Sequence, residues 1–266
     1  MKIIHLSDLH FGTHQGEIVK ITMESVRKHA PDLIIISGDF TQIANTKEFK
    51  QAKDFLDSLE TPFFCVPGNH DVPQRNVIER FFNPYKKYKT YIHEDLCPGF
   101  ENEDIILAGL NSARRALPHW NWANGALSSA QLKRLGHAFN RQQPESQSRR
   151  WRICTFHHPI HKIQDLPIDV TVFGAKAALQ SIQDLKVDLV LTGHVHHASI
   201  TSRGDENHQC IYLSASTAMS SRLRGQENGY NLITLDNDHM IIEIFSLGDS
   251  GFYKTQSFEK VKERQT

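Results

Sequence analysis

Predominantly apolar runs alternate with amphipathic stretches over the first quarter of the chain. Such runs of four residues lie at 3–6, 33–36 and 63–66 and are typical of short buried strands. Between them, Phe49, Ala52, Leu56 and Leu59 recur at steps of three and four residues, which is the period of an amphipathic helix, and a second helix is predicted over 15–29. The first 71 residues therefore predict β-α-β-α-β, an alternation that favours a parallel sheet covered by helices.

The same rhythm returns in the middle of the chain and changes near its end. Further strands are predicted at 105–110, 151–156 and 188–192, with helices after Ser128 and over 174–185. Beyond residue 199, short strands separated by Gly, Asn and Asp turns are predicted at 200–201, 211–213, 232–235, 241–245 and 252–258. We expect these last strands to form a second, antiparallel sheet.

Residues 72–104 interrupt the alternation. One helix there would carry an apolar side and a basic side, listed here as Val77, Phe81, Phe82, Tyr85 and Tyr88 against Lys86, Lys87 and Lys89. This segment is either a cap helix with a solvated basic face or a lid that selects the substrate. With 266 residues, the chain predicts a single domain over 1–258 that includes this cap or lid, followed by a charged tail at 259–266.

The composition narrows the classes of partner. Lys+Arg and Asp+Glu both number 30, so the chain has no net charge and nucleic-acid binding is not expected. The four cysteines form no Cys-x-x-Cys pair, which fits a reducing compartment. The chain begins without a signal-peptide pattern, and its apolar runs are far shorter than the ~20 residues of a membrane span. We expect a cytoplasmic protein; peripheral membrane contact is compatible with the sequence, and nothing in it declares an oligomeric state.

Polar side chains gather where the predicted strands end. The set is Asp8 and His10, Asp39, Asn69 and His70, His157, and His194 and His196. A single Asp-x-His or Asn-His is most simply a turn with a capping side chain. Together, at the carboxyl ends of strands expected in one sheet, these groups would be costly to bury without partners, and they predict a metal site.

The motifs Asp8-x-His10, Gly38-Asp39, Gly68-Asn69-His70-Asp71, His157 and Gly193-His194-x-His196 are complete and in order. This series resembles the calcineurin-like metallophosphoesterases, and most of all their cyclic-nucleotide phosphodiesterase (class III) branch. The resemblance implies an α/β fold of four layers, αββα, in which two mixed sheets pack face to face with helices outside.

The resemblance also implies a centre of two divalent metal ions. One ion would be held by Asp8, His10 and His196, the other by Asn69, His157 and His194, and Asp39 would bridge them. Imidazole and oxygen ligands without sulfur suit Mn, Fe or Zn. Such a centre implies attack on phosphorus by a metal-bridging hydroxide.

Other polar residues near the motifs have open roles. His70 is predicted to hydrogen-bond the phosphate or to protonate the leaving oxygen, and Asp71 either orients His70 or only caps a turn. His158 and His197 are expected to be neighbours of ligands rather than ligands. His5, His14 and His161 lie near strand ends, and Arg222 and Arg224 either reach a substrate anion or lie in a solvated hairpin.

The resulting hypothesis is a metal-dependent phosphodiesterase that hydrolyses a small diester or nucleotide such as 3′,5′-cyclic AMP. Alternatives with the same core are a UDP-2,3-diacylglucosamine pyrophosphatase, for which 77–91 would make an acyl-binding lid, a glycerophosphodiesterase and a DNA-repair nuclease. The absence of an extended basic stripe counts against the nuclease. A scaffold that keeps the fold without chemistry is disfavoured, because no expected ligand is missing.

Overall fold

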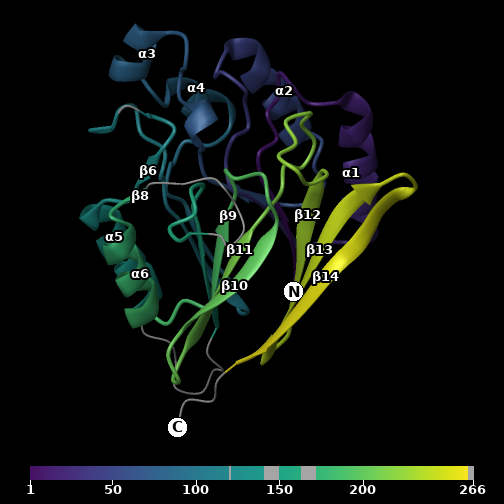
Figure 1. The fold of residues 1–266 in the computed structure, drawn as a ribbon, viewed down its shortest axis with the longest axis vertical. Helices are drawn as coiled ribbons and strands as arrows, with labels where there is room; N and C mark the ends of the chain where they lie inside the picture. The colour runs from purple at the N-terminus through teal and green to yellow at the C-terminus, as the bar shows by residue number, and fades with distance from the viewer. Residues whose placement is uncertain (120, 141–149, 163–171, 263–266) are drawn as a thin grey trace.

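Two six-stranded sheets pack face to face, and helices cover their outer faces (Figure 1). The computed structural model describes residues 1–119, 121–140, 150–162 and 172–262. The first sheet has the order β14-β13-β12-β1-β2-β3, and the second has the order β10-β11-β9-β7-β5-β4. The four-layer α/β fold expected from the motifs is confirmed.

The first sheet is mixed. Its strands are β1 (Lys2–Leu6), β2 (Leu33–Ile36), β3 (Phe63–Cys65), β12 (Gly229–Leu235), β13 (His239–Gly248) and β14 (Gly251–Val261). β1, β2 and β3 run parallel, and β12 pairs antiparallel with the free side of β1. Helices α1 (Gly16–Lys28) and α2 (Thr46–Asp57) connect the parallel strands and cover this sheet.

The second sheet is also mixed. Its strands are β4 (Gly99–Glu101), β5 (Ile105–Gly109), β7 (Trp151–Thr155), β9 (Leu189–Thr192), β10 (Ser199–Gly204) and β11 (Gln209–Ser214). Its central strands β5, β7, β9 and β11 are parallel, while β4 and β10 are antiparallel at the edges. Helices α5 (Ser129–Phe139) and α6 (Ala175–Asp184) cover it, and a small parallel pair, β6 (Gly125–Ala126) and β8 (Val172–Phe173), lies nearby.

The apolar runs are continuous because each strand is buried on both faces. Ile3 and Ile35 point into the layer between the sheets, where they pack with Ile153 and Leu189 of the second sheet. Ile4, one residue along, points instead to the layer under α1 and α2. The packing between the sheets thus fixes the strand ends of one sheet relative to those of the other.

The expectation of a separate C-terminal antiparallel sheet is wrong, as is that of a single sheet for the earlier strands. β10 and β11 extend the second sheet beside β9, and β12, β13 and β14 extend the first sheet beside β1. The sequence shows where strands lie, but their partners follow from the unpaired N–H and C=O groups along β1 and β9, which need a neighbouring strand.

The segment 72–104 is not one long helix. It forms α3 (Val77–Phe82) and α4 (Lys86–Tyr91), separated at Pro84, whose ring cannot continue a helix. Tyr88 is fully buried, whereas Phe82 is 79% exposed. The apolar side predicted for a single helix is therefore divided between the core and the surface.

The last strand extends beyond its predicted end. Residues 259–261, expected in the charged tail, pair with β13 as the end of β14. Within the described ranges, no helix is both long and apolar enough to span a bilayer.

Candidate metal centre

The side chains predicted as metal ligands all follow strand ends. Asp8 and His10 follow β1, Asp39 follows β2, Asn69 follows β3, His157 follows β7, and His194 and His196 follow β9. Direct contacts join all seven, although β1, β2 and β3 belong to one sheet and β7 and β9 to the other. The centre therefore lies where the carboxyl ends of these strands, from both sheets, come together.

The first group consists of Asp8, His10 and His196. Nε2 of His196 lies 3.1 Å from Oδ1 of Asp8, and Nε2 of His10 lies 3.6 Å from the same oxygen. The two Nε2 atoms are themselves 3.1 Å apart. All three side chains are buried, so their ligand atoms share one small space.

The second group consists of Asn69, His157 and His194. Nδ1 of His194 lies 2.9 Å from Oδ1 of Asn69, and the rings of His157 and His194 pack edge to face at 5.2 Å between centroids. The backbone N–H of His194 also donates to Oδ2 of Asp8 at 2.9 Å. This bond holds the second group against the first.

Asp39 lies between the two groups. Its Oδ2 is 3.8 Å from Nε2 of His10 in the first group and 3.2 Å from Nε2 of His157 in the second. Its Oδ1 accepts the backbone N–H of His70 at 2.8 Å, which fixes the orientation of the carboxylate. Oδ2 is thus the atom placed to be shared.

The hydrogen bonds of three imidazoles leave acceptor atoms facing one another. Nδ1 donates to a backbone carbonyl in His157 (Ser37, 2.8 Å), His196 (Arg222, 2.6 Å) and His10 (Thr41, 3.3 Å). In the neutral form of each ring, which is the form that binds a metal ion, the lone pair of Nε2 points into the centre, beside carboxylate oxygens that also accept.

These converging acceptors fit metal cations. Oδ1 of Asp8 and Nε2 of His157 are buried and have no hydrogen-bond partner within the described ranges. Buried acceptors without a donor are costly, and divalent ions would satisfy them. Nitrogen and oxygen donors without a thiolate match Mn, Fe or Zn.

The pKa values of the buried groups also favour a cation in the centre. Burial alone would raise the pKa of Asp8 and Asp39, but the surrounding imidazoles, His196 for Asp8 and His157 for Asp39, hold both pKa values below their ordinary range. Burial would lower the pKa of His157, yet the Asp39 carboxylate raises it to about 9. The centre favours positive charge between its carboxylates.

The backbone around the centre is strained. Five of the seven side chains stand on residues with positive φ, namely Asp8, His10, Asp39, His194 and His196. This conformation costs a non-glycine residue on the order of 1 kcal/mol or more, and it persists only where the surrounding structure enforces it. Glycine beside them allows close approach, since a Cβ on Gly193 would lie 1.8 Å from Oγ of Ser7.

Residues 1–198 match the model of the calcineurin-like phosphoesterase family. The chain belongs to this family. It is 30% identical to a "Probable glycerophosphodiester phosphodiesterase GpdQ" of Arcobacter nitrofigilis over 180 residues, 65% of this chain and 60% of that protein. It is 23% identical to a "Probable cyclic nucleotide phosphodiesterase" of Synechococcus over 184 residues, 68% of this chain and 64% of that protein.

The two matches thus span less than two thirds of the length of these relatives. A solved structure, a dimetal phosphatase from Danio rerio, superposes with a TM-score of 0.68 over 99% of both chains at 12% identity. At that identity the likeness shows the fold.

The other histidines singled out in the sequence have partners beyond the seven predicted ligands, although the ring of His158 also packs against His157 and His194. Nδ1 of His158 lies 2.7 Å from Oγ of Ser112 and its Nε2 lies 2.9 Å from the Ala123 carbonyl, so both ring nitrogens are occupied. His197 pairs with Gln226. Of the three near strand ends, His5 is buried against Ser37 and Asn231, His14 packs on Phe11, and His161 packs on Tyr212.

Arg222, whose role the sequence left open, lies at the centre. Its Nη1 donates to Nε2 of His70 at 3.1 Å and to Oε1 of Gln42 at 3.2 Å. Arg224 is exposed and makes one long contact, 3.4 Å, to the His194 carbonyl. Periodicity could not separate the two arginines, because the path of the segment between β11 and β12 depends on the bond from His196 to the Arg222 carbonyl.

His70 is oriented by the backbone rather than by Asp71. Its Nδ1 lies 2.6 Å from the Gln42 carbonyl, to which it donates, and burial lowers its pKa to about 4. Asp71 instead accepts the N–H groups of Thr41 (3.0 Å) and Gly68 (2.9 Å). Of the two roles proposed for Asp71, its contacts are those of a cap.

A cleft of about 310 Å³ opens beside Asn69 and His70. Val77 of α3 and Trp122 also line this cleft. The guanidinium of Arg80 lies 5.4 Å from the centroid of the Trp122 ring. Sequence analysis missed Trp122, because nothing in the local pattern places the 121–124 turn against α3.

Proposed function

We propose that this protein is a metal-dependent phosphodiesterase that hydrolyses a small diester such as 3′,5′-cyclic AMP. The observation that carries the proposal is the position of Asp39, whose Oδ2 faces both His10 and His157. One carboxylate oxygen between two separate groups of buried donors is suited to a pair of metal ions rather than to one.

The side chains at the centre form two sets of metal ligands, as the motifs imply. Asp8, His10 and His196 would hold one, Asn69, His157 and His194 the other, and Asp39 both. When bound, two divalent ions supply a nucleophile at neutral pH and neutralise charge on the phosphoryl oxygens.

Arg222 is the residue proposed to bind the phosphate. Its guanidinium is half-buried, and the side chains to which it donates, Gln42 and His70, are uncharged at neutral pH. Its positive charge is therefore available to an anionic substrate.

His70 positions Arg222 in this arrangement. Its Nδ1 carries the proton donated to Gln42, and its Nε2 accepts from Arg222, so it offers no proton to a leaving oxygen. Asp71 holds the loop that carries Asn69 and His70.

The cleft favours a substrate with a planar group. Trp122 is 38% exposed and lines the cleft together with Asn69 and His70, and a nucleobase in the cleft would stack on its ring. The resemblance to the Synechococcus relative agrees with a cyclic nucleotide. A glycerophosphodiester is the second candidate, favoured by the higher identity to the Arcobacter relative.

A hydrolysis panel with Mn added tests the proposal. It compares an aryl phosphodiester, an aryl phosphomonoester, 3′,5′-cyclic AMP, 2′,3′-cyclic AMP, glycerophosphoethanolamine and UDP-diacylglucosamine. We expect turnover of diesters, with 3′,5′-cyclic AMP preferred, and loss of turnover in the Asn69→Ala variant. Activity confined to the monoester, or an Asn69→Ala variant as fast as wild type, would contradict it.

A further inference from the structure

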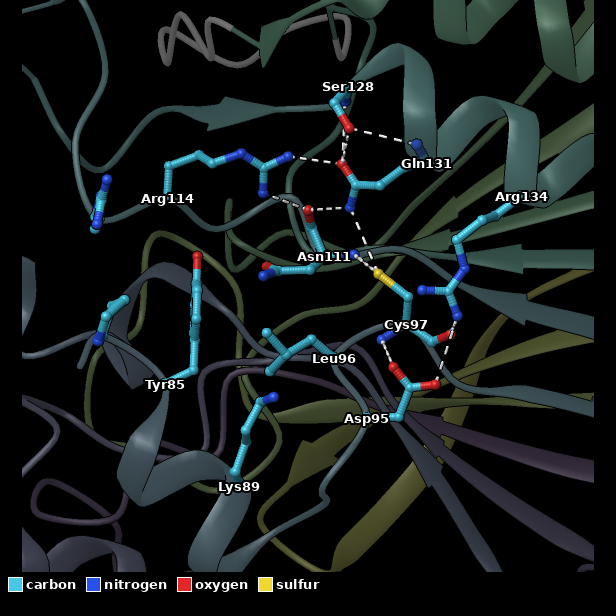
Figure 2. Close-up of a pocket in the computed structure, with 12 residues that line it drawn as sticks. Tyr85, Lys89, Asp95, Leu96, Cys97, Asn111, Arg114, Ser128, Gln131 and Arg134 are labelled. Atoms are coloured by element: carbon cyan, nitrogen blue, oxygen red, sulfur yellow. Dashed lines mark hydrogen bonds and ion pairs between the residues drawn. The ribbon is translucent and has the colours of Figure 1, made fainter. Parts of the chain in front are cut away.

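A second cavity, of about 570 Å³, lies between α4, α5 and the segment that follows β5 (Figure 2). It shares no lining residue with the cleft beside the metal centre. Its volume lies in the range of small-molecule binding sites, roughly 300–1,000 Å³. Nothing in the proposed reaction uses it.

The lining carries an excess of positive charge in a chain whose net charge is zero. Of its four cationic side chains, Arg134 is paired with Asp95 at 3.6 Å. The guanidinium of Arg114 instead contacts the carbonyls of Asn111 and Ala113 and the Oε1 of Gln131, none of which is charged.

Lys89 and Arg115 complete the group. Arg115 donates to the Phe81 carbonyl, and Lys89 projects toward the cavity in Figure 2. Within the described ranges, neither they nor Arg114 have a carboxylate at ion-pair distance. Three cations facing one cavity without a counter-ion point to an anionic ligand.

One wall of the cavity offers a different chemistry. Asn111 is 5% exposed, its Oδ1 has no hydrogen-bond partner within the described ranges, and its amide points into the cavity (Figure 2). A buried amide without a partner is costly unless a ligand satisfies it. The ring of Tyr85, held by a 2.7 Å bond from its hydroxyl to the Ala113 carbonyl, and the side chain of Leu96 add apolar surface beside it.

We infer that this cavity binds a nucleoside monophosphate. Its phosphate would face Lys89, Arg114 and Arg115, and its base would lie against Tyr85 with its polar edge on the Asn111 amide. The cationic side chains match the charge of a phosphate. The Asn111 amide and the Tyr85 ring match a planar base that has both hydrogen-bond donors and acceptors. The inference goes beyond the proposed reaction and does not depend on it.

Isothermal titration of the metal-loaded protein with AMP tests the inference, with inorganic phosphate and adenosine as separate titrants. The variant Lys89→Glu is expected to weaken AMP binding about tenfold or more, since it replaces a charge-assisted contact with repulsion. Lys86→Glu is the matched control, because Lys86 lies on the same helix but not in the lining, and it is expected to bind AMP as wild type does.

A second variant, Asn111→Leu, separates base from phosphate. It is expected to weaken AMP binding while leaving the weaker binding of inorganic phosphate unchanged, and thermal unfolding checks that it is folded. AMP binding that is insensitive to Lys89→Glu, or that disappears on chelation of the metals, would assign the binding to the metal centre and overturn the inference. Phosphate or adenosine binding as tightly as AMP would overturn it too.

Discussion

Nη1 of Arg222 lies 3.1 Å from Nε2 of His70, so the segment that links β11 of one sheet to β12 of the other reaches the loop after β3 beside the metal centre. The arginine and the histidine are 152 positions apart in the chain. This contact gives the centre a cation that belongs to the protein and places it next to the cleft.

Replacing Arg222 with alanine is expected to lower kcat/KM for a diester about tenfold or more, mainly through KM, because a charge-assisted contact to phosphate is lost. Arg224→Ala is the matched control and should stay within about twofold, since Arg224 is exposed and, among the described residues, has only the 3.4 Å hydrogen bond to the His194 carbonyl. Steady-state kinetics give kcat and KM for both variants. Equal losses in the two variants would show that the arginines contribute only their overall positive charge and that the position of Arg222 does not matter.

Because the two groups of donors are distinct, we expect that one metal ion can be lost while the other stays bound. His196→Ala removes one of the three side chains of the first group, so we expect the variant to keep about one of two metal equivalents on elemental analysis. His197→Ala, whose ring contacts Gln226, should keep both. Loss of both ions from His196→Ala would mean that the groups bind as one unit.

Asp71 is expected to matter for stability more than for chemistry. In Asp71→Asn, an amide NH₂ would face an N–H of Thr41 or Gly68, and the free energy of unfolding should fall by about 1–3 kcal/mol in urea titration. The metal-loaded variant should keep kcat within about tenfold. A kcat that falls more than about a hundredfold at unchanged stability would place Asp71 in the reaction.

Gly193 is required by close approach. A Cβ there would lie 1.8 Å from Oγ of Ser7 and 2.4 Å from Oδ2 of Asp8, so Gly193→Ala should displace Asp8 and reduce both metal content and activity. Gly136→Ala, with nothing within 4 Å in α5, should instead stabilise the protein by about 0.5–1 kcal/mol. Metal analysis and urea unfolding measure both, and full metal content in Gly193→Ala would contradict the role.

Trp122 is expected to select the substrate. Trp122→Ala should raise KM for 3′,5′-cyclic AMP at least about fivefold, because stacking on a base is lost, and should leave KM for glycerophosphoethanolamine within about twofold. Thermal unfolding of the variant controls for the loss of the Arg80 contact. An equal change in KM for both substrates would show that the base does not bind in this cleft.

The sequence by itself determined most of the secondary structure and which side chains meet at the centre. Its periodicity placed most strands and the longer helices within a few residues, since apolar spacing records which side of each element is buried. The short strands β4, β6 and β8 were not predicted. The helix predicted after Ser128 forms with a capping box of Ser128 and Gln131, a feature that depends only on neighbouring residues. The motifs identified the side chains that meet at the centre, because each follows a strand end.

Only the tertiary structure decided how these pieces are joined. The division of strands between two sheets depends on which backbone groups find partners across the chain, as β12 does beside β1. The placement of Arg222 on His70, of Trp122 beside Asn69, and of Lys89 opposite Asn111 depends on loops from distant parts of the sequence. Local patterns do not encode such contacts, because their energy comes from long-range packing and hydrogen bonding.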